Sequence, residues 1–232
     1  MAPTLNVTHI GTATALEING ARVVLEVTED PALRLDQLPV IDAVLLSHED
    51  HPDNLDDLGR QLLDGRRVFT TIDGGRKLAP PSCKIQNLLR HPPSTCLEMN
   101  VGFIVTGGIF GYGRDGLPNA IYFTGDTVFI EELPSIADWY HAWIAVMNLG
   151  NAKVPSTDDR NSPPMQITMG GKDGARLFRD LQADVLVLMH YEPWKYFTRF
   201  ETELRQAFEA EDISDKICWL KGARRSLFSR FC

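Results

Sequence analysis

Histidine and acidic residues lie at several points where an apolar run of this sequence ends. Imidazole and carboxylate side chains together suit zinc, manganese or iron, and loops that follow strands allow side chains from several strands to converge. A lone histidine at a strand end is usually a structural hydrogen-bonding residue, but repeated placement beside acidic neighbours predicts a metal site. The candidate ligands are His48, Asp50, His51, Asp53, His91, Asp126 and His190.

The densest group lies in the segment from Ser47 to Asn54. Two imidazoles and three carboxylates occur there within six residues, directly after an apolar run. The alternative interpretation is a polar loop in which Asp53 caps the helix that follows.

Asp126 follows a second apolar run and a glycine, in the sequence YFTGDT. An aspartate in this place can project its oxygens into a shared site, where it would bridge two metal ions. Either Asp53 or Asp126 could also accept a proton during catalysis. The alternative for Asp126 is a turn residue that caps a helix near residue 128.

His190 closes a third apolar run and begins the sequence HYEPW. Glu192 is a candidate to orient a metal-bound histidine, because such histidines usually donate their second ring N–H to a carboxylate or carbonyl; the alternative is a surface glutamate. Tyr191 and Trp194 are expected to line a substrate pocket. His9 is expected to have a packing or hydrogen-bonding role, and His141 is expected to lie at the edge of a strand or helix.

The elements that would position these residues are short apolar runs and amphipathic stretches. The first thirty residues are typical of a β-meander, and 42–47 suit a strand buried on both faces. Residues 71–82 are expected to be a connection, and 150–164 a long polar loop with a functional role. Further strands are expected near 66–70, 83–90, 99–106, 120–124, 143–149, 184–189 and 217–220, and helices near 53–63, 128–137, 173–181 and 199–210.

This order predicts a mixed α/β fold in which two β-sheets pack together and helices cover their outer faces. We expect a single domain over residues 1–232. The motifs GxSxG, GxxxxGK[ST] and GxGxxG followed by a helix do not occur. The glycine-rich segment from Gly107 to Gly113 is better explained as a loose hairpin than as a phosphate-binding loop.

Composition narrows the class of partner. The formal net charge of −8 argues against binding to nucleic acid or to an anionic membrane, and no apolar run is long enough to span a bilayer. The N-terminus lacks the pattern of a secretory signal, and the four cysteines are scattered. We therefore expect free thiols, a cytoplasmic protein and a small-molecule substrate.

The order of the motifs SHEDHPDN, RHPP, YFTGDT and LMHYEPW resembles the metallo-β-lactamase fold superfamily. The resemblance extends over nearly the whole chain. It implies a four-layer αββα sandwich with one or two metal ions, of which zinc is expected first and manganese or iron next. His91, Asp126 and His190 match the family's third histidine, bridging aspartate and last histidine.

The first loop departs from the family pattern HxHxDH, although His48 matches its first histidine. Without a gap, Asp50 and Asp53 replace the second and last histidines. With one inserted residue, His51 is the second histidine, Asp53 is the aspartate and Asn54 replaces the last histidine. Both registers stay open.

The resemblance implies a hydrolase in which a metal-activated water attacks an ester, lactone, amide or phosphoester. Two alternatives stay open beside it. One is an iron-dependent oxidoreductase on the same fold, and the other is a non-catalytic binding protein whose first loop no longer holds metal.

Overall fold

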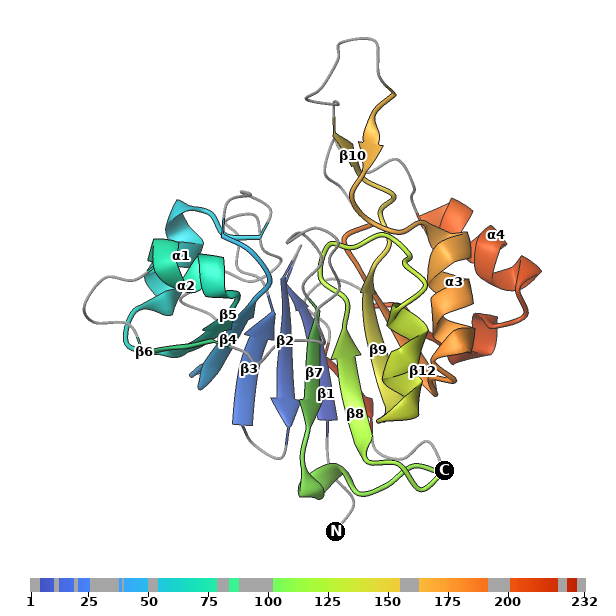
Figure 1. Ribbon diagram of the computed structural model, residues 1–232, viewed down its shortest axis with the longest axis horizontal. Helices are drawn as coiled ribbons and strands as arrows, with labels where there is room; N and C mark the ends of the chain where they lie inside the picture. The colour runs from blue at the N-terminus through green and yellow to red at the C-terminus, as the bar shows by residue number, and fades with distance from the viewer. Residues whose placement is uncertain are drawn as a thin grey trace. The chain divides into compact units, whose positions relative to one another are not determined.

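The chain, seen here in a computed structural model, forms two compact units, one made of Met1–Glu98 with Leu220–Cys232 and the other of Met99–Trp219 (Figure 1). That the whole chain is one domain stays a prediction. Among the described residues, no helix is long and apolar enough to cross a membrane. The structure describes residues 5–10, 13–18, 21–25, 38, 40–49, 54–78, 84–87, 102–154, 163–191, 201–220 and 225–228.

The first unit contains a seven-stranded sheet in the order β14-β1-β2-β3-β4-β5-β6. Its first three strands pair antiparallel, which confirms the predicted β-meander. From β3 to β6 the pairing is parallel, so that these strands end at the same edge. The strands are β1 (Leu5–Ile10), β2 (Ala13–Ile18), β3 (Ala21–Leu25), β4 (Ala43–Leu46), β5 (Arg67–Thr70), β6 (Lys84–Asn87) and β14 (Arg225–Phe228).

Two helices, α1 (Asp57–Leu63) and α2 (Ile72–Leu78), lie on this sheet (Figure 1). Leu62 and Leu63 of α1 pack in one buried cluster with strand residues. The N-cap of α1 is Asp56, whose Oδ1 accepts a hydrogen bond of 2.6 Å from the backbone N–H of Gly59. The helix thus begins later than predicted, and the suggested capping role of Asp53 is wrong because Asp56 fills it.

Helix α2 corrects the prediction of an irregular connection over residues 71–82. The side chain of Thr71 accepts a hydrogen bond of 2.9 Å from the N–H of Gly74, which caps the helix start. A Cβ on Gly74 would lie 2.6 Å from Oγ1 of Thr70 and 3.1 Å from Oε2 of Glu49. Glycine therefore lets the helix approach the sheet closely, a tertiary gain that outweighs its low helix propensity.

The second unit contains a five-stranded sheet in the order β13-β12-β9-β8-β7. Strands β8, β9, β12 and β13 are parallel, and β7 is antiparallel to β8. The glycine-rich segment connects the antiparallel strands β7 and β8, as the hairpin prediction requires. It includes a short 3-10 helix, η2 (Gly108–Phe110). The strands are β7 (Phe103–Thr106), β8 (Asn119–Phe123), β9 (His141–Asn148), β12 (Val185–Met189) and β13 (Ile217–Cys218).

Helices α3 (Gly171–Asp180) and α4 (Glu201–Ala210) pack on this sheet (Figure 1). Leu177 and Phe178 of α3 and Phe208 of α4 lie in one buried cluster with residues of β9 and β12. A short 3-10 helix, η4 (Ser214–Lys216), precedes β13.

Two further predictions in this unit need correction. The expected helix near 128–137 is the 3-10 helix η3 (Leu133–Asp138), which has Glu132 at its N-cap. Asp126 therefore does not cap it. The expected loop at 150–164 contains β10 (Lys153–Val154), which pairs antiparallel with β11 (Met165–Gln166).

Candidate metal site

The carboxyl ends of β8, β9 and β12 bring three polar residues to one edge of the second sheet. Asp126 follows β8, Asn148 ends β9, and His190 follows β12. The backbone holds these ends together, because Thr124 donates to the carbonyl of Val146 at 3.0 Å and Leu149 donates to that of Met189 at 3.1 Å. Parallel pairing of adjacent strands thus converts three distant sequence positions into neighbours.

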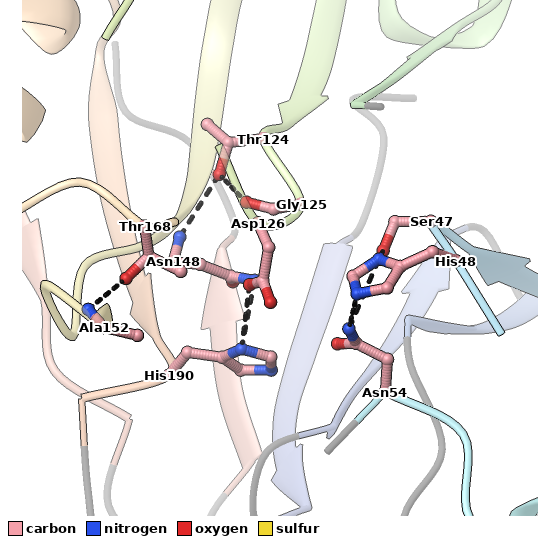
Figure 2. Close-up of polar contacts among 10 residues, drawn as sticks. All are labelled: Ser47, His48, Asn54, Thr124, Gly125, Asp126, Asn148, Ala152, Thr168 and His190. Atoms are coloured by element: carbon pink, nitrogen blue, oxygen red, sulfur yellow. Dashed lines mark hydrogen bonds and ion pairs between the residues drawn. The ribbon is translucent and has the colours of Figure 1, made fainter. Parts of the chain in front are cut away.

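The three side chains meet in direct contact (Figure 2). Asn148 Nδ2 donates to Asp126 Oδ1 at 2.7 Å, and His190 Nδ1 lies 3.2 Å from the same oxygen. Asn148 Nδ2 also lies 3.2 Å from His190 Nδ1. The side chain of His190 is fully buried and that of Asp126 is 9% exposed, so both are held in a largely dry environment.

The backbone of His190 adopts the left-handed conformation, with φ at 51°. Few residues other than glycine adopt this conformation, although histidine does so more often than most. The sharp turn ends β12 and places the imidazole beside Asp126 in place of continuing the strand. Such strain persists where the surrounding structure fixes it, and it is common at functional sites.

Tyr191 lies in the core of the second unit. Its ring is 6% exposed and meets the ring of Trp219 edge-on, with centroids 5.8 Å apart. This contact anchors the chain directly after His190. That Tyr191 also lines a substrate pocket stays a prediction.

In the first unit, the predicted first loop places His48 directly beyond β4. Ser47 Oγ lies 2.9 Å from His48 Nδ1, and the side-chain amide of Asn54 contacts both ring nitrogens (Figure 2). Asn54 is fully buried, and its Oδ1 has no hydrogen-bond partner within the described part of the chain. The two ends of the loop are therefore joined by the contact between His48 and Asn54.

Glu49, the residue next to His48, has a structural role. Its side chain is 6% exposed, and Oε1 lies 2.8 Å from Nζ of Lys77 in α2. Hydrogen bonds from Lys77 to Asp73 and Glu49 raise the pKa of the lysine. The backbone carbonyl of Glu49 also accepts a hydrogen bond of 2.9 Å from Arg60 in α1. These contacts fix the start of the loop to both helices.

The remaining predicted site residues lie outside the described residues, so their roles stay predictions. This set comprises Asp50, His51, Asp53, His91, Glu192 and Trp194.

Asp126 and His190 are chemically suited to a zinc, manganese or iron ion, because they bring a carboxylate and an imidazole into contact at one edge of the sheet. If His190 Nδ1 carries the proton and donates it to Asp126, Nε2 keeps the lone pair that a metal requires. The described residues contain no group of three or more histidine, cysteine, aspartate or glutamate side chains that could hold a metal.

Two polar residues with clear structural roles were not singled out from the sequence. One of them is Asn148. It could have been found from the sequence, because it lies at the end of a long apolar run, as Asp126 and His190 do.

The other is His141, the first residue of β9, which is 3% exposed. Its Nδ1 lies 2.8 Å from Oδ2 of Asp115, and its Nε2 lies 2.9 Å from Oδ2 of Asp184. Burial alone would lower the pKa of His141, but hydrogen bonds and charge from Asp184 and Asp115 raise it overall. The two carboxylates therefore favour the protonated ring, in which both nitrogens donate, at the opposite end of β9 from Asn148.

No family model and no curated protein matches this chain. Solved structures do match it, at low sequence identity. A metallo hydrolase, Igni18, from Ignicoccus hospitalis is 18% identical, with a TM-score of 0.71 over 98% of this chain and 99% of that chain. An isothiocyanate hydrolase from Delia radicum gut bacteria is 19% identical, with a TM-score of 0.71 over 97% of this chain and 100% of that chain.

The metallo-β-lactamase fold protein YhfI from Bacillus subtilis is 13% identical, with a TM-score of 0.56 over 97% of this chain and 99% of that chain. These similarities define the fold. The chain has the metallo-β-lactamase fold, which confirms the mixed α/β class and the fold that the resemblance implied.

Proposed function

We propose that this protein is a metal-dependent hydrolase that acts on a small-molecule ester, lactone, amide or phosphoester. The observation that carries the proposal is the contact between Asp126 and His190 at the ends of β8 and β12, two parallel strands that lie on either side of β9. Both residues match ligand positions of the fold superfamily that the sequence resembles. The hydrolases among the structural neighbours support the same class of reaction.

In this proposal, Asp126 and His190 are metal ligands, and the family resemblance further implies His48 and residues of the undescribed loops as ligands. A bound zinc, manganese or iron ion would lower the pKa of a coordinated water to about 7 and so supply a hydroxide nucleophile. Asp53 or Asp126 would accept a proton, and Glu192 would orient a liganding histidine. Tyr191 and Trp194 would shape the substrate pocket.

For the first loop, we favour the register with one inserted residue. In that register Asn54 stands where the family has its last histidine, and Asn54 contacts the ring of His48. The second ligand of the loop would then be His51, with Asp53 as the family's aspartate. A cytoplasmic location remains part of the proposal and rests on the scattered cysteines of the sequence.

Hydrolysis by metal-loaded protein tests this function. We would assay a p-nitrophenyl ester, a lactone, a p-nitroanilide and a bis(p-nitrophenyl) phosphodiester with zinc-, manganese- and iron-loaded protein. We expect hydrolysis of at least one class, loss of activity with chelator, and recovery when metal is restored.

Asp126→Ala should lower that activity by at least about tenfold, because it removes a proposed ligand. Asp138→Ala is the matched control, since Asp138 is an exposed carboxylate at the end of η3 and should leave activity unchanged. If metal-loaded protein hydrolysed none of the four classes, or if Asp126→Ala were as active as the wild type, the proposal would be wrong.

A further inference from the structure

We propose that Asn148 is a positioning residue that holds Asp126 and His190 in the geometry needed to bind metal. This inference rests on the proposed function and extends it to a residue that is not itself a ligand. Asn148 is fully buried at the end of β9, the strand that lies between β8 and β12. Its side chain contacts those of both Asp126 and His190 (Figure 2).

The hydrogen-bond donors around Asp126 give Asn148 this role. Asn148 Nδ2 donates to Asp126 Oδ1 at 2.7 Å, and His190 Nδ1 lies 3.2 Å from the same oxygen. Two contacts on one oxygen restrict the rotation of the carboxylate. Asn148 thus helps to set the orientation in which Asp126 would face a metal.

The backbone of Asn148 is fixed on both sides, so its amide cannot move independently of the neighbouring strands. Its N–H donates to Oγ1 of Thr124 at 3.2 Å, and the residue pairs in register with Met189 of β12. Thr124 precedes Asp126 by two residues, and Met189 directly precedes His190. A rigid donor between two ligands is the arrangement that preorganises a metal site.

The amide is also costly at this position. Asn148 Oδ1 is buried and has no hydrogen-bond partner among the described residues. An unsatisfied buried polar atom destabilises a fold, and leucine, of similar shape, would avoid that cost. Packing alone therefore does not explain an asparagine here, whereas donation to Asp126 does.

Asn119 provides a matched control within the same sheet. It is the first residue of β8, at the opposite end of that strand from Asp126. Its Nδ2 donates to the carbonyl of Phe110 at 2.9 Å, and its Oδ1 is likewise buried without a described partner. Substitution of either asparagine removes one amide donor, but only Asn148 contacts Asp126.

The test measures the zinc dissociation constant of folded protein by competition with a chromogenic chelator, together with the absorption spectrum of the cobalt-loaded form. We expect Asn148→Leu to weaken zinc binding by about 10–100-fold, as loss of a partner of a metal ligand typically does. It should also change the cobalt spectrum. Asn119→Leu should leave both unchanged, even if it lowers thermal stability.

Asn148→Gln retains an amide and should bind zinc more tightly than Asn148→Leu, and it provides a second folded variant if the leucine variant does not fold. If the wild type binds zinc and both Asn148 variants bind it within about twofold of the wild type, the positioning role is wrong and the metal site stands. If the wild type binds no metal, the proposed function fails and this inference fails with it.

Discussion

His190 and Asp126 lie side by side, with His190 Nδ1 3.2 Å from Asp126 Oδ1 in a largely buried environment. The contact joins the ends of β8 and β12, which are separated in the sheet by β9. A carboxylate beside a histidine Nδ1 favours the tautomer that keeps the lone pair on Nε2, as in many metal sites.

Asp126→Asn separates the charge of Asp126 from its shape. The variant keeps an oxygen that can accept the hydrogen bond from Asn148 but loses the negative charge that a metal ligand provides. We expect the free energy of unfolding without metal to change by less than about 1 kcal/mol, and zinc affinity to fall by at least about tenfold. Chemical denaturation and chelator competition measure the two quantities. Unchanged zinc affinity would remove Asp126 from the set of ligands.

Single substitutions in the first loop distinguish its two registers. With one inserted residue, His51→Ala should reduce bound zinc and Asp50→Ala should not, whereas the register without a gap predicts the reverse. Glu49→Gln is the control, because Glu49 pairs with Lys77 and is not a proposed ligand. This variant should bind as much zinc as the wild type does. Zinc content after identical loading and desalting reports the result. Equal loss in His51→Ala and Asp50→Ala would contradict both registers.

The charged network around the buried His141 predicts a pH-dependent stability. Asp115 and Asp184 hold the ring, and Arg114 lies 3.4 Å from the second oxygen of Asp184. Because the pKa of His141 is raised in the folded protein, its contribution is fully present below about pH 6.5 and is lost as pH rises through the folded pKa.

His141→Gln should remove this component, whose slope cannot exceed about 1.4 kcal/mol per pH unit. Urea denaturation of both proteins at several pH values above 6.5 measures the difference between them. We expect the two stability curves to converge as pH rises. Curves that stay parallel over this range would show that folding does not raise the pKa of His141.

Gly113 packs directly on the same ring. A Cβ at this position would lie 2.2 Å from Cγ of His141, a distance that requires the ring or the loop to move. Gly113→Ala should lower the free energy of unfolding by about 1–3 kcal/mol. Gly108→Ala is the matched control, because a Cβ there meets nothing within 4 Å. Thermal unfolding compares the two, and equal midpoints would be inconsistent with the described packing.

The sequence predicted the features that depend on the local pattern of apolar and polar residues, such as where strands end. Apolar runs ending in Asp126 and His190 identified strand ends, and parallel pairing then brought these residues together. The sequence did not predict α2, because the close approach allowed by Gly74 is a tertiary effect.

The network of His141 also could not be predicted, since its carboxylate partners lie 26 and 43 residues away in the sequence. Asn148 was missed for a different reason. An asparagine at a strand end has no metal-binding signature of its own, and its importance depends on the two ligands beside it.

Elemental analysis of the purified protein tests the central claim most directly, both as isolated and after loading with zinc, manganese or iron and desalting. We predict one or two equivalents of transition metal in the wild type and in Asp138→Ala, and a marked loss in His190→Ala and Asp126→Ala folded to the same extent. A wild-type protein that retains no transition metal under any loading condition would contradict the account.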